Sequence, residues 1–429
     1  MTSMVKVLLF LWLMIFVLIG FANAQDGKWI TCLDEDVSMI EPFRGTNRVI
    51  VGGRHGAIAL LDLSTNQVHA QPRASGQIIR FHVDEQRRRL YYVVAKDNQL
   101  DFVVASLNQE ATKIANPRTL RLEHEGDQAF GVFDSLAQRC CLTTRLRFGP
   151  LQSTIIDLEK MAVISTREVE IETRSVVGNP RFALRKAAFF GDRQLAYVHG
   201  GTHRSFTIAI HPVDHPTQIT KHRIKGLVSM LLPSAGGDSI DLVVFNGETR
   251  EKAVYSHYRS KPSSRGGIGF ELLNQTSTAF FLPACDVCTP GDVMLKFVEK
   301  NSVDSTRHQF VLRNAVQSSQ LIARTFSGLG PHSCVFDLHP RTKDLVTFFA
   351  KTKEVCVTPL CHDSDSRNAQ TFKIDLQIRG NCLCEVFCCG DDGQYVVIAD
   401  LVVPAVNSPP WQNRHQVLVL DRSYSGGDY

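Results

Sequence analysis

The 429-residue sequence lacks the short patterns that define several common classes of catalytic site. It contains no Gly-x-Ser-x-Gly nucleophile turn, no His-Glu-x-x-His zinc motif, no phosphate-binding P-loop and no dinucleotide-binding glycine pattern. These absences exclude the enzymes that such motifs define. They do not exclude an active site built from single residues of separate segments, because such a site leaves no local pattern. No catalytic residue can be named from the sequence.

Charge of one sign and long apolar runs are also scarce. The formal net charge is only +4, with 21% charged residues, which does not favour a nucleic-acid partner. Beyond the first 24 residues, no apolar run approaches the ~18 to 20 residues that a membrane-spanning helix needs. We therefore expect no nucleic-acid binding and no membrane span in the remainder of the chain.

Residues 1–24 have the three parts of a secretory signal peptide. Lys6 precedes the apolar run Val7–Phe21, and Ala22-Asn23-Ala24 follows as an A-x-A cleavage site. A retained signal anchor is the alternative, but this apolar run is short for a bilayer span of ~20 residues. The sequence predicts cleavage after Ala24 and a secreted, extracellular chain of residues 25–429.

Helical periodicity is absent, and short apolar runs separated by polar turns take its place. In one stretch the turn Asp84-Glu85-Gln86 precedes the run Leu90–Ala95, and a second turn at 96–98 precedes the run Leu100–Leu107. Runs of this length between polar clusters are typical of antiparallel strands in a meander. The chain is therefore predicted to be all-β.

The same pattern recurs along the whole chain. We count eight units between residues 36 and 421, of about 48 residues each, and weak strands leave seven as an alternative. One four-stranded meander cannot cover both of its apolar faces, so such units must stack against one another. Sheet twist and radial closure then predict a single β-propeller domain, residues 25–429, of seven or eight four-stranded antiparallel blades.

The two ends of the chain predict how the ring closes. The last unit ends at Val417–Asp421 with three strands, and the apolar segment Lys28–Leu33 has no unit of its own. We expect the N-terminal strand to supply the missing strand of the last blade.

The blade pattern resembles secreted β-propellers in architecture. "DEQRRRLYYV" is similar to the inner-strand turn of YWTD and NHL propellers, "VIVGG" and "AYVHGG" resemble kelch strand ends, and "IIDL", "ALLDL" and "LVLD" resemble the third strand of WD40 blades. No Tyr-Trp-Thr-Asp and no Trp-Asp occurs, and the chain has only three Trp. The resemblance therefore implies the architecture, and no family's functional residues are transferred.

The twelve cysteines are unevenly distributed, with nine of them at positions 285–389. An extracellular compartment favours disulfides, while buried free thiols and a zinc site remain alternatives. Cys285 with Cys288, and Cys356 with Cys361, are candidate local bridges, and Cys32 is a candidate to join the last blade. Strand alternation places Cys382, Cys384 and Cys388 on one face of the sheet and Cys389 on the other. The disulfide candidates are Cys32, Cys285, Cys288, Cys356, Cys361, Cys382, Cys384, Cys388 and Cys389.

Other candidate sites are weaker. His199 and His203, and likewise His211 and His215, have spacings that can hold a metal across a hairpin, but solvated loop histidines are the favoured interpretation and no metal is predicted. Asn274-Gln275-Thr276 is a glycosylation sequon.

Two functions are compatible with the sequence. The favoured one is a secreted, monomeric, non-enzymatic propeller without a cofactor that binds an extracellular protein or glycan. The alternative is a secreted hydrolase or lactonase of propeller type that holds Ca²⁺ in its central channel.

Overall fold

The computed structural model describes residues 27–422 except 98, 135, 137, 146–150, 170–186, 192, 203–204, 216, 235–236, 250–251, 263–267, 279–283, 290–291, 301–305, 315–319, 328–333, 350–351, 360–369, 375–382 and 402–415. These residues form the strands β1–β32 and contain no α-helix, which confirms the all-β prediction. None of the described elements is a helix with the length and hydropathy to cross a membrane.

The described strands form eight four-stranded antiparallel sheets, which we number as blades 1 to 8. Blade 1 contains β2 (Val37–Phe43), β3 (Arg48–Gly53), β4 (Ile58–Asp62) and β5 (Gln67–Gln71). Blade 2 contains β6 (Gln77–Asp84), β7 (Arg89–Lys96), β8 (Gln99–Leu107) and β9 (Ile114–Leu122). Blade 3 contains β10 (Gln128–Phe133), β11 (Arg139–Arg145), β12 (Leu151–Asp157) and β13 (Ala162–Val169). Blade 4 contains β14 (Ala187–Phe190), β15 (Gln194–Thr202), β16 (Ser205–Pro212) and β17 (Thr220–Lys225).

The second half of the chain repeats this order. Blade 5 contains β18 (Leu227–Pro233), β19 (Ile240–Thr249), β20 (Lys252–Pro262) and β21 (Ile268–Thr278). Blade 6 contains β22 (Ala284–Thr289), β23 (Asp292–Lys300), β24 (Thr306–Asn314) and β25 (Gln320–Ser327). Blade 7 contains β26 (Cys334–Leu338), β27 (Asp344–Phe349), β28 (Glu354–Pro359) and β29 (Gln370–Lys373). Blade 8 contains β30 (Leu383–Cys389), β31 (Tyr395–Leu401), β32 (Gln416–Asp421) and β1 (Lys28–Thr31).

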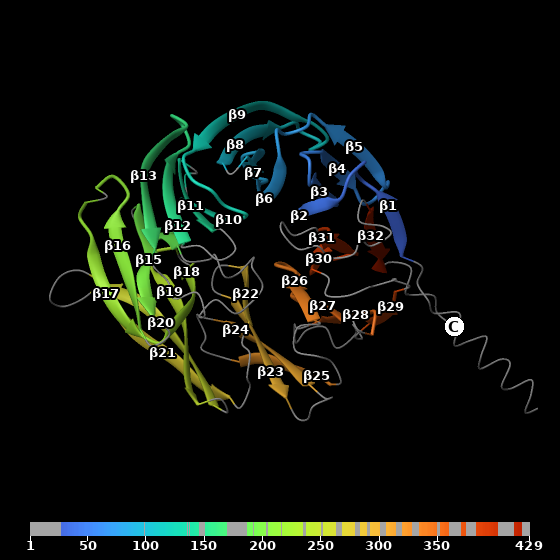
Figure 1. The fold of residues 1–429 in the computed structure, drawn as a ribbon. Coiled ribbons are helices and arrows are strands. Elements are labelled where there is room, and N and C mark those ends of the chain that lie inside the picture. Colours follow the sequence, from blue (N-terminus) through green and yellow to red (C-terminus); the bar gives the residue numbers. More distant parts are fainter. Residues whose placement is uncertain are drawn as a thin grey trace, which may run out of the picture.

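The blades follow one another around a ring (Figure 1). The first strand of each blade lies nearest the centre and the last strand lies at the periphery, so the chain runs outward through each sheet. The innermost strands of neighbouring blades contact one another, as β2 does with β6 and β26 does with β30. The contacts of β2 with β30 and β31 close the circle between blades 1 and 8.

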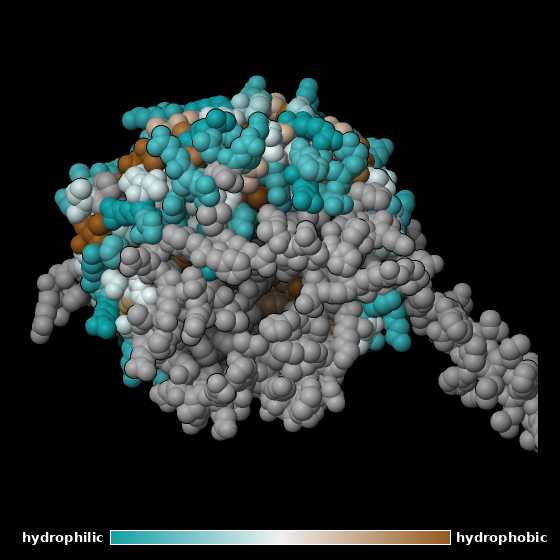
Figure 2. All heavy atoms as spheres, in the orientation of Figure 1, coloured by the Kyte–Doolittle hydropathy of each residue, from teal (hydrophilic) through white to brown (hydrophobic). Residues whose placement is uncertain are grey.

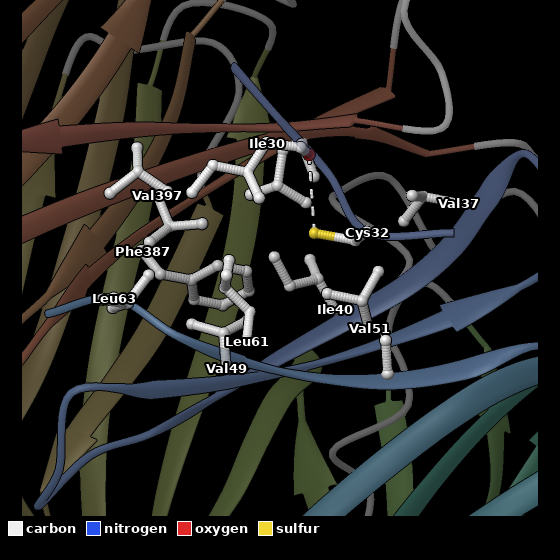
Figure 3. Packing of buried hydrophobic residues seen from close by; sticks show 14 of the residues in the cluster. Ile30, Cys32, Val37, Ile40, Val49, Val51, Leu61, Leu63, Phe387 and Val397 are labelled. Atoms are coloured by element: carbon white, nitrogen blue, oxygen red, sulfur yellow. Dashed lines mark hydrogen bonds between the residues drawn. The ribbon is translucent and has the colours of Figure 1, made fainter. Parts of the chain in front are cut away.

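The N-terminal strand closes the ring as predicted. β1 pairs antiparallel with β32, so that Trp29 lies opposite Leu418 and Ile30 lies opposite Val417. Ile30, which is only 6% exposed, belongs to an apolar cluster that includes side chains of both blade 8 and blade 1. Figure 3 shows Ile30 and Cys32 packed among residues of these two blades. Closure therefore combines backbone pairing with apolar burial.

Candidate functional site

Arg44, directly after β2, connects three blades near the innermost strands. Its two terminal nitrogens donate to the two carboxylate oxygens of Asp337 on β26, at 2.6 and 2.9 Å. It also donates to the Cys388 carbonyl on β30 at 3.3 Å, and its guanidinium lies 5.7 Å from the centre of the Phe387 ring. Asp337 accepts a further hydrogen bond from the Cys388 backbone N–H at 3.0 Å. Blades 1, 7 and 8 are thus joined by one charged network.

Arg80 on β6 makes the corresponding connection on the other side of blade 1. Its guanidinium lies 3.6 Å from the carboxylate of Glu41 on β2 and 5.0 Å from the centre of the Phe130 ring on β10. The Arg80 and Glu41 side chains are only 10% and 15% exposed. Each of the two arginines therefore has an acid from one blade and a phenyl ring on which its flat face can lie.

The electrostatics of the Arg44–Asp337 pair indicate a structural role. Burial by itself lowers the pKa of Arg44, but the charge of Asp337 and its hydrogen bonds raise that pKa well above its ordinary value. Arg44 is therefore charged at every physiological pH, and its charge is compensated by Asp337. The space-filling view shows a hollow at the centre of the molecule with hydrophobic residues at its depth (Figure 2). The described acids Asp337 and Glu41 are ion-paired with arginines, so they lend no support to the predicted alternative of a channel-bound Ca²⁺.

Sequence reasoning missed all four members of these pairs. Each of Glu41, Arg80 and Asp337 is a charged residue within an apolar inner strand, as in "VSMIEPF". A charged side chain that is buried at such a position needs a partner of opposite charge. The sequence therefore contained a signal for these residues, namely a charged residue inside an apolar run. The identity of the partner was not present, because the partners lie on other blades.

The described candidates for metal ligation, His199, His211 and His215, belong to no group of three potential metal ligands. The rings of His199 and His211 each lie edge-on to the ring of Tyr197, with centroids 6.2 and 5.7 Å from it. His211 is 1% exposed and its Nδ1 donates to the carbonyl of Pro212 at 2.7 Å. His215 is exposed in a turn, and His203 lies outside the described residues. No group of three or more potential metal ligands occurs in the described part of the chain.

Seven cysteines whose side chains the structure describes are free thiols. The predicted bridge from Cys32 to the last blade is not formed, and the Cys32 Sγ lies 3.5 Å from the carbonyl oxygen of Ile30. Cys361 and Cys382 lie outside the described residues, and Cys285 and Cys288 lie on β22. The free thiols are Cys32, Cys140, Cys141, Cys356, Cys384, Cys388 and Cys389.

The cysteines of β30 pack in two different apolar layers. Cys384 and Cys388 belong to the apolar cluster between blades 7 and 8, whereas Cys389 belongs to the cluster between blades 8 and 1. This confirms the predicted alternation of the three residues. The cysteines here serve as small apolar side chains in the layers between blades, which is a common use of buried cysteine.

Asn274 lies in β21, where its backbone pairs with His257. The sequon is therefore on the last strand of blade 5, at the periphery of the ring. Its glycosylation stays a prediction.

Comparison with known proteins finds structures of similar fold but no family to which the chain can be assigned. No protein-family profile matches the chain, and no curated protein matches it in sequence. Among solved structures, it is similar to the C-terminal WD40 domain of Sif2, at a TM-score of 0.57 and 11% identity over 93% of this chain and 99% of that one. It is also similar to the Dos1 propeller, at 0.52 and 8% identity over 92% and 94% of the two chains. An uncharacterized protein, lmo1340 of Listeria monocytogenes EGD-e, matches at 0.51 and 10% identity over 83% and 99%.

The chain has a WD40-like β-propeller fold. The sequence identities are so low that these likenesses establish architecture alone, since one fold serves many functions.

Exposed apolar side chains of this propeller gather on one blade. Among the described residues, four large apolar side chains are exposed, and three of them belong to blade 3: Leu136 at 58%, Val163 at 42% and Ile164 at 37%. Leu136 lies in the turn between β10 and β11, and the other two lie on β13. Figure 2 shows hydrophobic residues on the outer surface where β13 lies in Figure 1.

Proposed function

We propose that this protein is a secreted, non-enzymatic propeller that binds a partner protein through blade 3, at the outer strand β13 and the turn between β10 and β11. The observation that carries the proposal is the exposure of Leu136, Val163 and Ile164 on this one blade. Exposed apolar patches on soluble proteins mark interaction sites, because the removal of apolar surface from water lowers the free energy. The WD40-like fold supports the proposal by supplying a rigid frame for such a surface.

A protein partner fits these side chains better than a glycan does. Aliphatic side chains such as Leu136 and Ile164 are stabilised when they are buried against another apolar surface. A glycan presents mainly hydroxyl groups, which an aliphatic side chain cannot satisfy.

Secretion is supported by Lys6, the apolar run and the A-x-A site of residues 1–24. Expression of the full chain in a eukaryotic secretory cell line tests it. We expect the protein in the medium with Gln25 as its first residue. Retention in the cell with residue 1 intact would contradict the proposal.

Binding is tested with a variant that removes the three exposed apolar side chains of blade 3. The triple variant Leu136→Ser, Val163→Ser, Ile164→Ser should fold, because all three side chains are already exposed. The wild-type protein and the variant are each immobilised and exposed to extracellular fluid. We expect at least one protein that the wild type retains and the variant does not, and identical retention by both would refute this surface.

A further inference from the structure

The outer part of the boundary between blades 3 and 4 is lined by basic side chains. β17 is the last strand of blade 4, and its register places Lys221 opposite Ala209 and Arg223 opposite Thr207. Ala209 belongs to the apolar cluster between blades 3 and 4, so this is the face of β17 that turns toward blade 3. Lys225 shares this face by strand alternation. All three basic residues of β17 are exposed.

Blade 3 contributes a basic side chain to the same boundary. Arg167 of β13 donates to the hydroxyl of Tyr197, which belongs to the same inter-blade cluster as Ala209. We call the four residues Arg167, Lys221, Arg223 and Lys225 the basic seam. The strand residues of β15–β17 that share this face include no carboxylate in the described part of the chain.

His199 reports the positive charge of the basic seam. Burial lowers the pKa of His199, and the charges of Lys221 and Arg167 lower it further. A cation is therefore disfavoured at this position and an anion is favoured.

β13 differs from the neighbouring outer strands in how its edge is protected. Outer strands of natural sheets carry proline or lysine, which discourage pairing with another strand. β9 contains Pro117, and β17 contains three of the four residues of the basic seam. β13 contains neither proline nor lysine. Its pairing with β12 is irregular between Val163 and Ser165, and it carries the charged Arg167 and Glu168 further along the strand. Beside this irregularity, Val163 and Ile164 are exposed β-branched residues of high strand propensity. Its outer edge has no partner strand among the described sheets.

We propose that the outer edge of β13 receives an extended acidic segment of the partner protein as an added strand. This rests on the proposed protein-binding function and names the surface and the partner's chemistry. The backbone of the segment pairs with β13, as in other cases of strand addition. Its apolar residues cover Val163 and Ile164, and its carboxylates face the basic seam, where opposite charges make the correct partner preferable to others.

The test uses two fluorescently labelled ten-residue peptides and the purified full-length secreted protein. One peptide alternates valine with glutamate, and the other alternates valine with lysine. We expect the Val/Glu peptide to bind, with an affinity that falls as salt is raised, and the Val/Lys peptide not to bind.

Two pairs of matched variants locate the site. Lys221→Glu with Arg223→Glu should weaken Val/Glu binding about tenfold or more, whereas Arg54→Glu with Lys96→Glu makes the same charge change on exposed residues of blades 1 and 2 and should have no effect. Ile164→Lys should likewise abolish binding by protecting the edge, whereas Leu272→Lys, on the comparably exposed β21, should not.

The other outcomes overturn the proposal. They are no binding of the Val/Glu peptide, equal binding by the seam variants and their controls, or binding of heparin without binding of the peptide, which would indicate a sulfated glycan. Self-association that Ile164→Lys abolishes, without peptide binding, would assign the edge to a second copy of the chain. A partner protein that is lost from the serine variant but kept by Lys221→Glu with Arg223→Glu would leave the proposed function standing and refute the acidic segment.

Discussion

Asp337 has more hydrogen-bonding partners than an isolated surface acid would have. Its carboxylate accepts from both terminal nitrogens of Arg44 and from the backbone N–H of Cys388, and its side chain is 8% exposed. A second arginine–aspartate pair, Arg341 with Asp391, joins blades 7 and 8 at 2.9 Å, but its side chains are 66% and 67% exposed. The two pairs have the same kinds of side chain but different exposed fractions, so a comparison of them isolates the effect of burial on stability.

We expect Asp337→Asn to lower the free energy of unfolding by about 2 to 3 kcal/mol, because it leaves the partly buried Arg44 without a compensating charge. Asp391→Asn should change it by less than about 0.5 kcal/mol, because water screens the exposed pair. Denaturant titration measures both. Similar losses for the two variants would show that burial does not decide the strength of these pairs.

The buried His339 should make the free energy of unfolding depend on pH. It is fully buried, its Nε2 donates to the Gly390 carbonyl at 2.8 Å, and its Nδ1 accepts from the Thr342 N–H at 3.1 Å. Burial lowers the pKa of His339 below the ordinary value of 6.5, although the hydrogen bond to Gly390 opposes this. As pH falls below that ordinary value, the unfolded chain takes up a proton that the folded chain does not, so stability is lost.

His339→Gln removes this titration while glutamine still offers an N–H and an oxygen. We expect the unfolding free energy of the variant to fall less than that of the wild type between pH 7 and pH 5. Denaturant titrations across this range provide the measurement. Parallel pH profiles for the two proteins would contradict the assignment, whatever the absolute stability of the variant.

At the scale of elements, the short strand β1 closes the ring. Its four residues complete blade 8, and Ile30 is buried between blades 8 and 1. We expect Ile30→Ala to lower the unfolding free energy by about 2 to 4 kcal/mol, as for other buried isoleucines. Lys28→Ala, on an exposed residue of the same strand, should change it by less than about 0.5 kcal/mol. If both variants unfold at the same denaturant concentration as the wild type, β1 does not hold the ring closed.

Elements also repeat an ion pair that the sequence analysis did not find. The second and third strands of blades 1, 3 and 5 carry an arginine and an aspartate at directly opposed positions: Arg48 with Asp62, Arg139 with Asp157, and Asp241 with Arg259. The three pairs have separations of 3.2, 3.0 and 2.7 Å. The order of the two residues is reversed in blade 5, which hides the repeat from a comparison of sequence letters.

At the scale of the whole molecule, the apolar layers between blades determine the state of the thiols. Burial raises the pKa of Cys32 and of Cys388 to about 12, so neither forms the reactive thiolate at neutral pH. We expect native protein treated with iodoacetamide at pH 8 to be alkylated at the partly exposed Cys356 and to be protected at Cys32, Cys388 and Cys389.

Unfolding in denaturant without a reductant should expose all of these thiols to the reagent, and peptide mass spectrometry follows each one. A disulfide-linked peptide that contains Cys32 in the unreduced digest would contradict the structure. It would support the bridge that secretion and cysteine content favour.

Much of the fold could be predicted because its causes are local. The run at Leu90–Ala95 and the turns beside it became β7 and its hairpins, since alternation and turn chemistry depend on adjacent residues. The alternation of Cys384, Cys388 and Cys389 followed from the period of a strand. The inner charged pairs could not be predicted in this way, because Arg44 and Asp337 are 293 positions apart.

The amino-acid sequence by itself determined the strand pattern, a grouping into seven or eight blades and the two incomplete ends that join, because strand period and the burial of apolar faces act over a few residues. Only the tertiary structure decided which charges meet near the innermost strands, that Cys384, Cys388 and Cys389 fill apolar layers as thiols, and that β13 and β17 bring an edge without proline or lysine beside a row of basic side chains. Those contacts depend on the angle through which each blade is rotated relative to its neighbours, and that angle is a property of the closed ring.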